Sequence, residues 1–210
     1  VDFGNTFIKV AVFSGNNMMH FSSYQQLSTQ EVFNIFEQFP GIDRSIISSV
    51  IQHPVEINDF LSRNTRFLEL DQHTPLPINN SYKTPQTLGK DRISAAVAGH
   101  SLFPEKNVLV LMAGTCITYD FVDQEGLYHG GAISPGLRMR LKALNHFTDH
   151  LPLVEIERDV PLIEKTTKGS ILSGVMNGTI KEVDGIIDEY KKNYENLTVI
   201  LSGGAADYFD

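Results

Sequence analysis

Residues 2–6 are Asp2-Phe3-Gly4-Asn5-Thr6, and residues 7–13, Phe-Ile-Lys-Val-Ala-Val-Phe, follow directly. The second run is rich in strand-forming residues and ends at a Ser-Gly-Asn-Asn turn, so we expect a strand there. Because glycine has no side chain, the backbone at Gly4 can approach a ligand closely, and the N–H groups of such a turn can face an anion. Asp2 could hold Mg²⁺ through water, and Lys9 could add a positive charge. An ordinary hairpin turn would have the same residues, so this turn alone does not decide the function.

Two further glycine turns follow strand-like runs. Gly114-Thr115-Cys116 comes after residues 108–112, and Gly203-Gly204 comes after residues 198–201. The order of strand, glycine turn, strand, turn, strand and then helices therefore occurs twice. This repetition predicts an α/β protein of two duplicated lobes, residues 1–105 and 106–210, although α/β chains also repeat such units by chance. Further strands are expected at 18–27, 45–51, 66–70, 116–122 and 127–133, helices at 29–39, 54–64, 91–102, 136–147 and 170–194, and a loop at 76–88.

Composition excludes several classes of protein. The 210 residues carry 17 Lys and Arg against 25 Asp and Glu, a net charge of −8, which argues against a nucleic-acid partner. No apolar run approaches the roughly 20 residues that a membrane span needs. The single cysteine, Cys116, allows no intrachain disulfide, and with no signal peptide visible we expect a reducing cytoplasm. Both ends look cut, so we expect a few residues in front and a terminal segment behind.

A candidate catalytic carboxylate lies in Leu88-Gly89-Lys90-Asp91-Arg92, between a proline-bearing loop and a predicted helix. Aspartate at a helix N-cap can be purely structural. The Asp91 carboxylate could also orient an alcohol for attack on a γ-phosphoryl group and accept its proton, because phosphoryl transfer needs mainly positioning and charge neutralisation. Arg92 could bind a substrate carboxylate or the transferring phosphate. The spacing leaves both interpretations open. The P-loop and dinucleotide-binding patterns are absent from the sequence.

Together these motifs resemble the type III pantothenate kinases of the acetate and sugar kinase, Hsc70 and actin superfamily, in order and through almost the whole chain. Residues 130–136, Gly-Gly-Ala-Ile-Ser-Pro-Gly, and 202–205, Ser-Gly-Gly-Ala, extend the resemblance. It implies two ribonuclease H-like, actin-like lobes with mixed sheets flanked by helices. It also implies ATP-dependent phosphorylation of pantothenate to 4'-phosphopantothenate, the first step of coenzyme A biosynthesis, with Mg²⁺ and a homodimer.

The same resemblance implies roles for single residues. Asp91 would be the catalytic proton acceptor, and residues 202–205 would lie on the adenosine side. Pantothenate would be bound by Tyr82, Gly89, Lys90, Asp91, Arg92 and Thr167. ATP would be bound by Asp2, Phe3, Gly4, Asn5, Thr6, Phe7, Ile8, Lys9 and Thr115, with Asp2 near the Mg²⁺.

One position departs from the family's pattern. Many family members have an aspartate two residues before the second turn's glycine, where it binds K⁺ or NH₄⁺, and this chain has Met112. A thioether is a poor ligand for a hard cation, which puts a monovalent-cation site in doubt. Asp120, further along, could compensate in charge.

Two other functions remain compatible with the sequence. The chain could be a kinase of the same superfamily for another small alcohol, such as a sugar, although Tyr82 with the Gly-x-Asp-Arg motif is pantothenate-like. It could also be a non-catalytic or regulatory relative, since the family includes proteins described as transcriptional accessory factors. Met112 favours that alternative, whereas Asp2, Asp91 and Thr115 argue against it.

Overall fold

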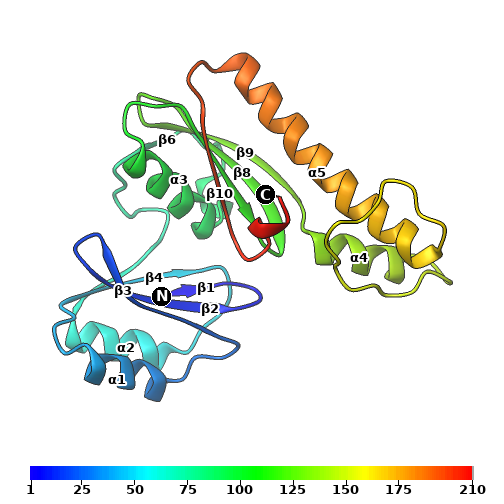
Figure 1. Ribbon diagram of the computed structural model, residues 1–210. Helices are drawn as coiled ribbons and strands as arrows, with labels where there is room; N and C mark the ends of the chain where they lie inside the picture. The colour runs from blue at the N-terminus through cyan, green and yellow to red at the C-terminus, as the bar shows by residue number, and fades with distance from the viewer. Residues whose placement is uncertain (210) are drawn as a thin grey trace. The chain divides into compact units, whose positions relative to one another are not determined.

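The computed structural model describes residues 1–209 (Figure 1). These residues form two mixed five-stranded sheets with helices packed against them. The chain divides into two compact units, which we describe separately. The first unit holds residues 1–75 and 84–94, and the second holds residues 76–83 and those from 95 onward.

The sheet of the first unit has the order β3-β2-β1-β4-β5. Its strands are β1 (Asp2–Phe3), β2 (Ile8–Ser14), β3 (Asn17–Tyr24), β4 (Arg44–Ser49) and β5 (Arg66–Glu69). The first three strands form an antiparallel meander, β4 lies parallel beside β1, and β5 continues in parallel. Gly15, with φ +58°, makes the tight turn between β2 and β3. The short β1 therefore lies in the middle of the sheet.

Two helices cover one face of this sheet, α1 (Thr29–Gln38) and α2 (Val55–Asn64), which lie side by side in Figure 1. Ser28 begins α1 through a capping box, in which its hydroxyl accepts from the Glu31 amide while the Glu31 carboxylate accepts from the Ser28 amide. The apolar residues of the helices face the sheet at helical spacing. They form one core with β1, β2 and β4 that contains Phe3, Ile8, Val10, Leu27, Val32, Ile35, Ile47, Ile57 and Leu61.

The sheet of the second unit has the order β10-β7-β8-β9-β6. Its strands are β6 (Asn79–Asn80), β7 (Val108–Ala113), β8 (Cys116–Val122), β9 (Leu127–Pro135) and β10 (Thr198–Ser202). Here β7, β8 and β9 form an antiparallel meander, and β10 lies parallel beside β7. The meander and the following parallel strand thus have the same arrangement as β1, β2, β3 and β4 in the first unit. The edge strand β6 pairs in parallel with β9.

Helices α3 (Lys90–Leu102) and α5 (Thr167–Asn193) pack against the second sheet, and α4 (Leu137–His146) packs against the first half of α5. Figure 1 shows α3 and α5 on opposite faces of the sheet. Successive β7 side chains point to opposite faces, so Val108 and Val110 meet α3 at Gly99, while Leu109 and Leu111 share a core with Val183 of α5. Burial on both faces explains why β7 is a continuous apolar run.

The expected elements are confirmed, with shifts at their ends. Residues 76–88, expected to be a loop, contain β6 and a short 3-10 turn at Pro85–Thr87. Two prolines and many polar side chains hid a strand of only two residues. Helix α5 begins at Thr167 rather than at residue 170, because the Thr166 hydroxyl caps it by accepting from the Gly169 amide. None of the helices within residues 1–209 is long and apolar enough to cross a membrane.

Candidate active site

The first glycine turn joins β1 to β2 in the first unit. Asp2 pairs with Lys9 and Phe3 with Ile8, so residues 4–7 form the exposed end of a hairpin. A Cβ atom at Gly4 would lie 3.0 Å from the Phe7 carbonyl oxygen, which explains the glycine. Among the residues expected to bind ATP, Phe3 and Ile8 have buried side chains. Only the backbone at these two positions is available to a ligand, whereas the Asn5 and Thr6 side chains are exposed.

Phe3 fixes the base of this turn. Its side chain is fully buried and stacks on His53, with ring centroids 4.5 Å apart. His53 is in turn hydrogen-bonded to Asn58 of α2, with Nε2 2.9 Å from Oδ1. Packing between β1 and α2 therefore fixes the start of the turn, as a preorganised anion site requires.

Asp2 and Asp91 influence each other within the first unit. Burial raises the pKa of Asp2 above its ordinary value, Lys9 opposes that rise, and the Asp91 carboxylate adds to it. A cation beside Asp2 would offset both the burial of its carboxylate and the repulsion from the Asp91 carboxylate. No three His, Cys, Asp or Glu side chains within residues 1–209 come together as a metal site. Mg²⁺ commonly needs only one or two carboxylates, with water and phosphate oxygens as its other ligands, so the residues at Asp2 fit this ion.

Asp91 lies in the first turn of α3 with its side chain exposed. Its Oδ1 atom accepts a hydrogen bond of 2.9 Å from the Arg92 amide. A Cβ atom at Gly89 would lie 2.5 Å from Asp91 Oδ1, so glycine leaves the space that this carboxylate occupies. Arg92 is only 5% exposed. The Gly89-Lys90-Asp91-Arg92 motif thus presents one carboxylate to the outside and turns its arginine inward.

Tyr82 belongs to the second unit, where β9 holds it. The Ser81 amide and hydroxyl both donate to the Tyr128 carbonyl oxygen, at 3.1 and 2.7 Å. The Tyr82 ring stacks on the Tyr128 ring, and a Cβ atom at Gly130 would lie 3.0 Å from it. The Tyr128 hydroxyl donates to the buried Asp120 carboxylate at 2.7 Å. No sequence pattern predicts this support from Tyr128.

The second glycine turn joins β7 to β8, and Gly114 and Thr115 are exposed at its tip. The Gly136 amide donates to the Thr115 carbonyl oxygen at 3.1 Å, and a Cβ atom at Gly136 would lie 2.5 Å from that same oxygen. From the other side, the Ala205 amide donates to the Ala113 carbonyl oxygen at 2.9 Å. The three glycine segments of this half of the sequence, which include Gly203 with φ +105°, therefore meet at one place.

Met112 and Asp120 occupy different parts of the second sheet. Met112 pairs with Thr118 on β8 and with Ser202 on β10. Asp120 is fully buried two residues further along β8 and accepts from Tyr128. Met112 offers a thioether where a hard cation needs oxygen, so the residues here do not fit a monovalent ion as an aspartate would.

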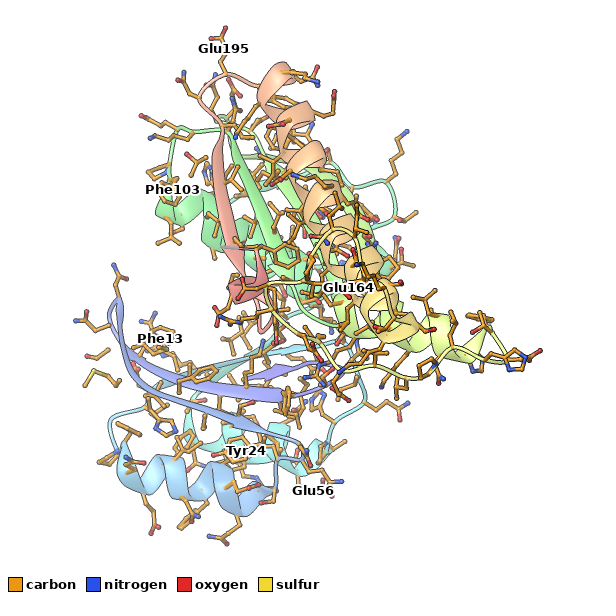
Figure 2. All side chains as sticks on the ribbon, turned by 45° about the vertical axis from the view of Figure 1, so that its right-hand side comes forward. Phe13, Tyr24, Glu56, Phe103, Glu164 and Glu195 are labelled. Carbon is orange, nitrogen blue, oxygen red and sulfur yellow. The ribbon has the colours of Figure 1, made fainter. Side chains whose placement is uncertain are left out.

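Thr167 is the first residue of α5 and is exposed. A polar hollow of about 190 Å³ lies beside the start of this helix, and its lining includes Glu164, Thr166 and Lys168. Lys168 pairs with Glu157 at 2.6 Å. Glu164, labelled in Figure 2, lies against Gly169 in the first turn of α5. The N-terminus of α5, where the helix dipole favours a negative charge, thus already has the Glu164 carboxylate beside it.

Comparison with known proteins identifies the family. The sequence model described as "Type III pantothenate kinase" matches residues 1–189. The chain belongs to the type III pantothenate kinase family. A type III pantothenate kinase of Christiangramia forsetii is 45% identical over 205 residues, which cover 97% of this chain and 84% of that protein. One from Phocaeicola vulgatus is 44% identical over 211 residues, which cover 100% of this chain and 87% of that protein.

A solved structure shares the fold of this chain without close sequence similarity. It is that of a protein from Campylobacter jejuni described as a Baf family transcriptional activator, which matches with a TM-score of 0.54 at 18% identity. The match covers 99% of this chain and 84% of that one. At this identity the likeness concerns the fold alone. The resemblance that the motifs predicted is confirmed by the family match.

Proposed function

We propose that this type III pantothenate kinase transfers the γ-phosphoryl group of ATP to the primary hydroxyl of pantothenate, with Asp91 accepting the hydroxyl proton. The activity follows from the family: the chain is a kinase that phosphorylates pantothenate in coenzyme A biosynthesis. The observation that carries the role of Asp91 is its exposed carboxylate, in the space left by Gly89 and close enough to Asp2 to raise the pKa of that residue.

Asp2 and Lys9 act on the phosphates. The raised pKa of Asp2 supports a bound cation beside it, and Mg²⁺ supplies the charge neutralisation that phosphoryl transfer requires. The exposed Asn5 and Thr6 side chains and the backbone of residues 3, 4, 7 and 8 contact the phosphate oxygens. Thr115 contacts ATP from the second glycine turn, and residues 202–205 lie on the adenosine side.

Tyr82, Arg92 and Thr167 bind pantothenate, together with Gly89 and Lys90. Support for Tyr82 comes from the backbone and ring contacts with β9 that fix its position. Arg92 suits the pantothenate carboxylate because a guanidinium can donate two parallel hydrogen bonds to it. Support for Thr167 is its exposure at the start of α5.

Three broader features complete the proposal. The shared order of the meander and parallel strand in both sheets supports duplicated actin-like lobes. The expected bounds are residues 1–105 and 106–210, but α3 packs at Gly99 against the second sheet, so we place residues 95–105 with the second lobe. We expect a cytoplasmic homodimer, and sedimentation of the purified protein at twice the monomer mass would test the dimer. Met112 argues against a monovalent cation as a cofactor.

The role of Asp91 is tested by Asp91→Asn, with Asp59→Asn on the exposed side of α2 as the control. Formation of 4'-phosphopantothenate should fall by about 10²–10⁴-fold in the first variant, the range for loss of a general base. The control should keep the wild-type rate. Turnover by Asp91→Asn within about tenfold of wild type would show that another group accepts the proton.

A further inference from the structure

The exposed Thr115 turn rests on the segment where β9 passes into α4. Gly136, the residue before α4, donates its amide to the Thr115 carbonyl oxygen at 3.1 Å and abuts the Gly114 carbonyl oxygen. The position of Gly136 therefore sets the position of the turn. The residues that hold Gly136 in place act on the turn without touching a ligand.

Arg140 fastens this segment from the first turn of α4. Its Nε atom donates to the Pro135 carbonyl oxygen at 2.8 Å, and its Nη2 atom donates to the Ser134 hydroxyl at 2.6 Å. The Arg140 amide also donates to the Gly136 carbonyl oxygen at 3.0 Å. One residue thus binds three consecutive positions, 134–136, that lead up to the Thr115 turn. The rigid planar guanidinium suits this task, whereas a lysine presents a single mobile ammonium group.

Glu182 of α5 completes the arrangement. Its Oε2 atom accepts from Arg140 Nη2 at 2.6 Å, and its Oε1 atom accepts from the Tyr119 hydroxyl at 3.4 Å. The side chains of Arg140 and Glu182 are 23% and 29% exposed, so this ion pair is partly shielded from water. The pair therefore ties the end of β9 to α5, the helix that begins at Thr167.

The charges of this group stay fixed across the neutral range. Burial alone would raise the pKa of Glu182, but hydrogen bonds from Ser134 and Arg140, together with the charge of Arg140, hold it below its ordinary value. Burial, followed by the neighbouring Glu182 charge, raises the pKa of Tyr119 to about 12. Glu182 is therefore ionised and Tyr119 protonated wherever the enzyme would work.

We propose that Arg140 and Glu182 are positioning residues for the Thr115 turn, and that through it they set the affinity for ATP. This inference rests on the proposed contact between Thr115 and ATP. Loss of the pair frees residues 134–136, and Gly136 then no longer fixes the Thr115 carbonyl oxygen. The segment that carries Tyr82 is held by β6 and by the Ser81 hydrogen bonds to the Tyr128 carbonyl oxygen, and its ring stacks on Tyr128. None of these contacts involves Arg140 or Glu182.

A second ion pair supplies the matched control. Lys192 and Glu189 on the same helix α5 are also 2.6 Å apart, but their side chains are 67% and 66% exposed and touch no glycine turn. Exposed pairs contribute little to stability. Glu189→Gln therefore removes the same kind of charge from α5 without disturbing the segment before α4.

The test measures ATP affinity of the intact chain by titration calorimetry and the KM for each substrate in turnover. Arg140→Lys and Glu182→Gln should raise the Kd for ATP about tenfold or more and leave the KM for pantothenate within about twofold. Glu189→Gln should change neither. Thermal unfolding of each variant shows whether it remains folded. Ser134→Ala, which removes one acceptor of Arg140 and one hydrogen-bond donor to Glu182, should raise the Kd for ATP about threefold and serves if the larger changes unfold the protein.

Two results would overturn the proposal. One is a Kd for ATP within about twofold of wild type in folded Arg140→Lys and Glu182→Gln. The other is an equal rise in both KM values, which indicates general loss of structure. Thr115→Ala separates this proposal from the role of the turn itself. If Thr115→Ala keeps its ATP affinity, the proposed contact with ATP fails; if only Thr115→Ala loses affinity, the positioning by Arg140 and Glu182 fails.

Discussion

Gly136→Ala should displace the Thr115 turn and weaken ATP binding. The backbone at Gly136 has φ −70° and ψ 167°, which alanine adopts without strain, so the effect of the methyl group is one of contact alone. The new Cβ atom would lie 2.5 Å from the Thr115 carbonyl oxygen, whereas ordinary contact begins at 3.4 Å. The two backbone segments must therefore separate by at least 3.4 − 2.5, about 0.9 Å, because the Gly114 carbonyl oxygen lies closer still to the new Cβ atom.

That separation has a cost in stability and a cost in ATP binding. Forcing an extra methyl group into a packed site typically destabilises a protein by about 1–3 kcal/mol. The hydrogen bond of 3.1 Å from the Gly136 amide to Thr115 would also be stretched or lost. Because a misplacement of about 1 Å can reduce catalysis by about 10²-fold, we expect the Kd for ATP to rise by about tenfold or more.

Gly174→Ala is the control for this change. A Cβ atom at Gly174 has nothing within 4 Å, and the residue lies within α5. Alanine should stabilise the helix there by about 0.5–1 kcal/mol and leave ATP binding unchanged. Urea unfolding and calorimetric titration with ATP measure both variants. If Gly136→Ala binds ATP and unfolds as the wild type does, the contact between Gly136 and the Thr115 turn does not position that turn.

Three further predictions concern other parts of the site. Tyr128→Phe removes the hydroxyl that donates to buried Asp120, so the free energy of unfolding in urea should fall by about 1–3 kcal/mol. The KM for pantothenate should rise because the support of Tyr82 is loosened. An unchanged KM would show that Tyr128 does not act on the pantothenate site. The folded pKa of Asp2 lies above its ordinary value of 3.8, so ionising Asp2 costs stability as pH rises through that range, and the loss persists at higher pH. Asp2→Asn should therefore unfold at higher urea than wild type at neutral pH but not at pH ~3, and the opposite order would contradict the burial of this carboxylate. Because Met112 replaces a carboxylate, exchange of potassium for choline chloride should change wild-type turnover by less than about twofold, and a larger loss would reveal a monovalent-cation site elsewhere.

Most of the secondary structure was predictable from local patterns. The run at 108–112 is wholly apolar and the run at 116–122 is rich in strand-forming residues, and the β7 and β8 strands lie there. A strand of two residues such as β6 has no such pattern, because its pairing with β9 depends on residues far away in the sequence. The extra turn of α5 depended on the single capping hydroxyl of Thr166.

The glycines of the site were predictable, but the reasons for them were not. Gly136 is required by the Thr115 carbonyl oxygen, and Gly203 by the backbone of Ala113, contacts that span 21 and 90 positions of the chain. Such requirements arise only when distant segments meet, so a single sequence shows the glycine and not its partner. Arg140 was missed for the same reason, since its acceptors lie on β9 and α5.

Phosphorylation of pantothenate at the expense of ATP can be observed in the products of the wild-type chain incubated with ATP, Mg²⁺ and pantothenate. Mass spectrometry should detect 4'-phosphopantothenate and ADP in equal amounts. Binding of ATP with no 4'-phosphopantothenate formed would contradict this activity and would indicate a non-catalytic member of the family.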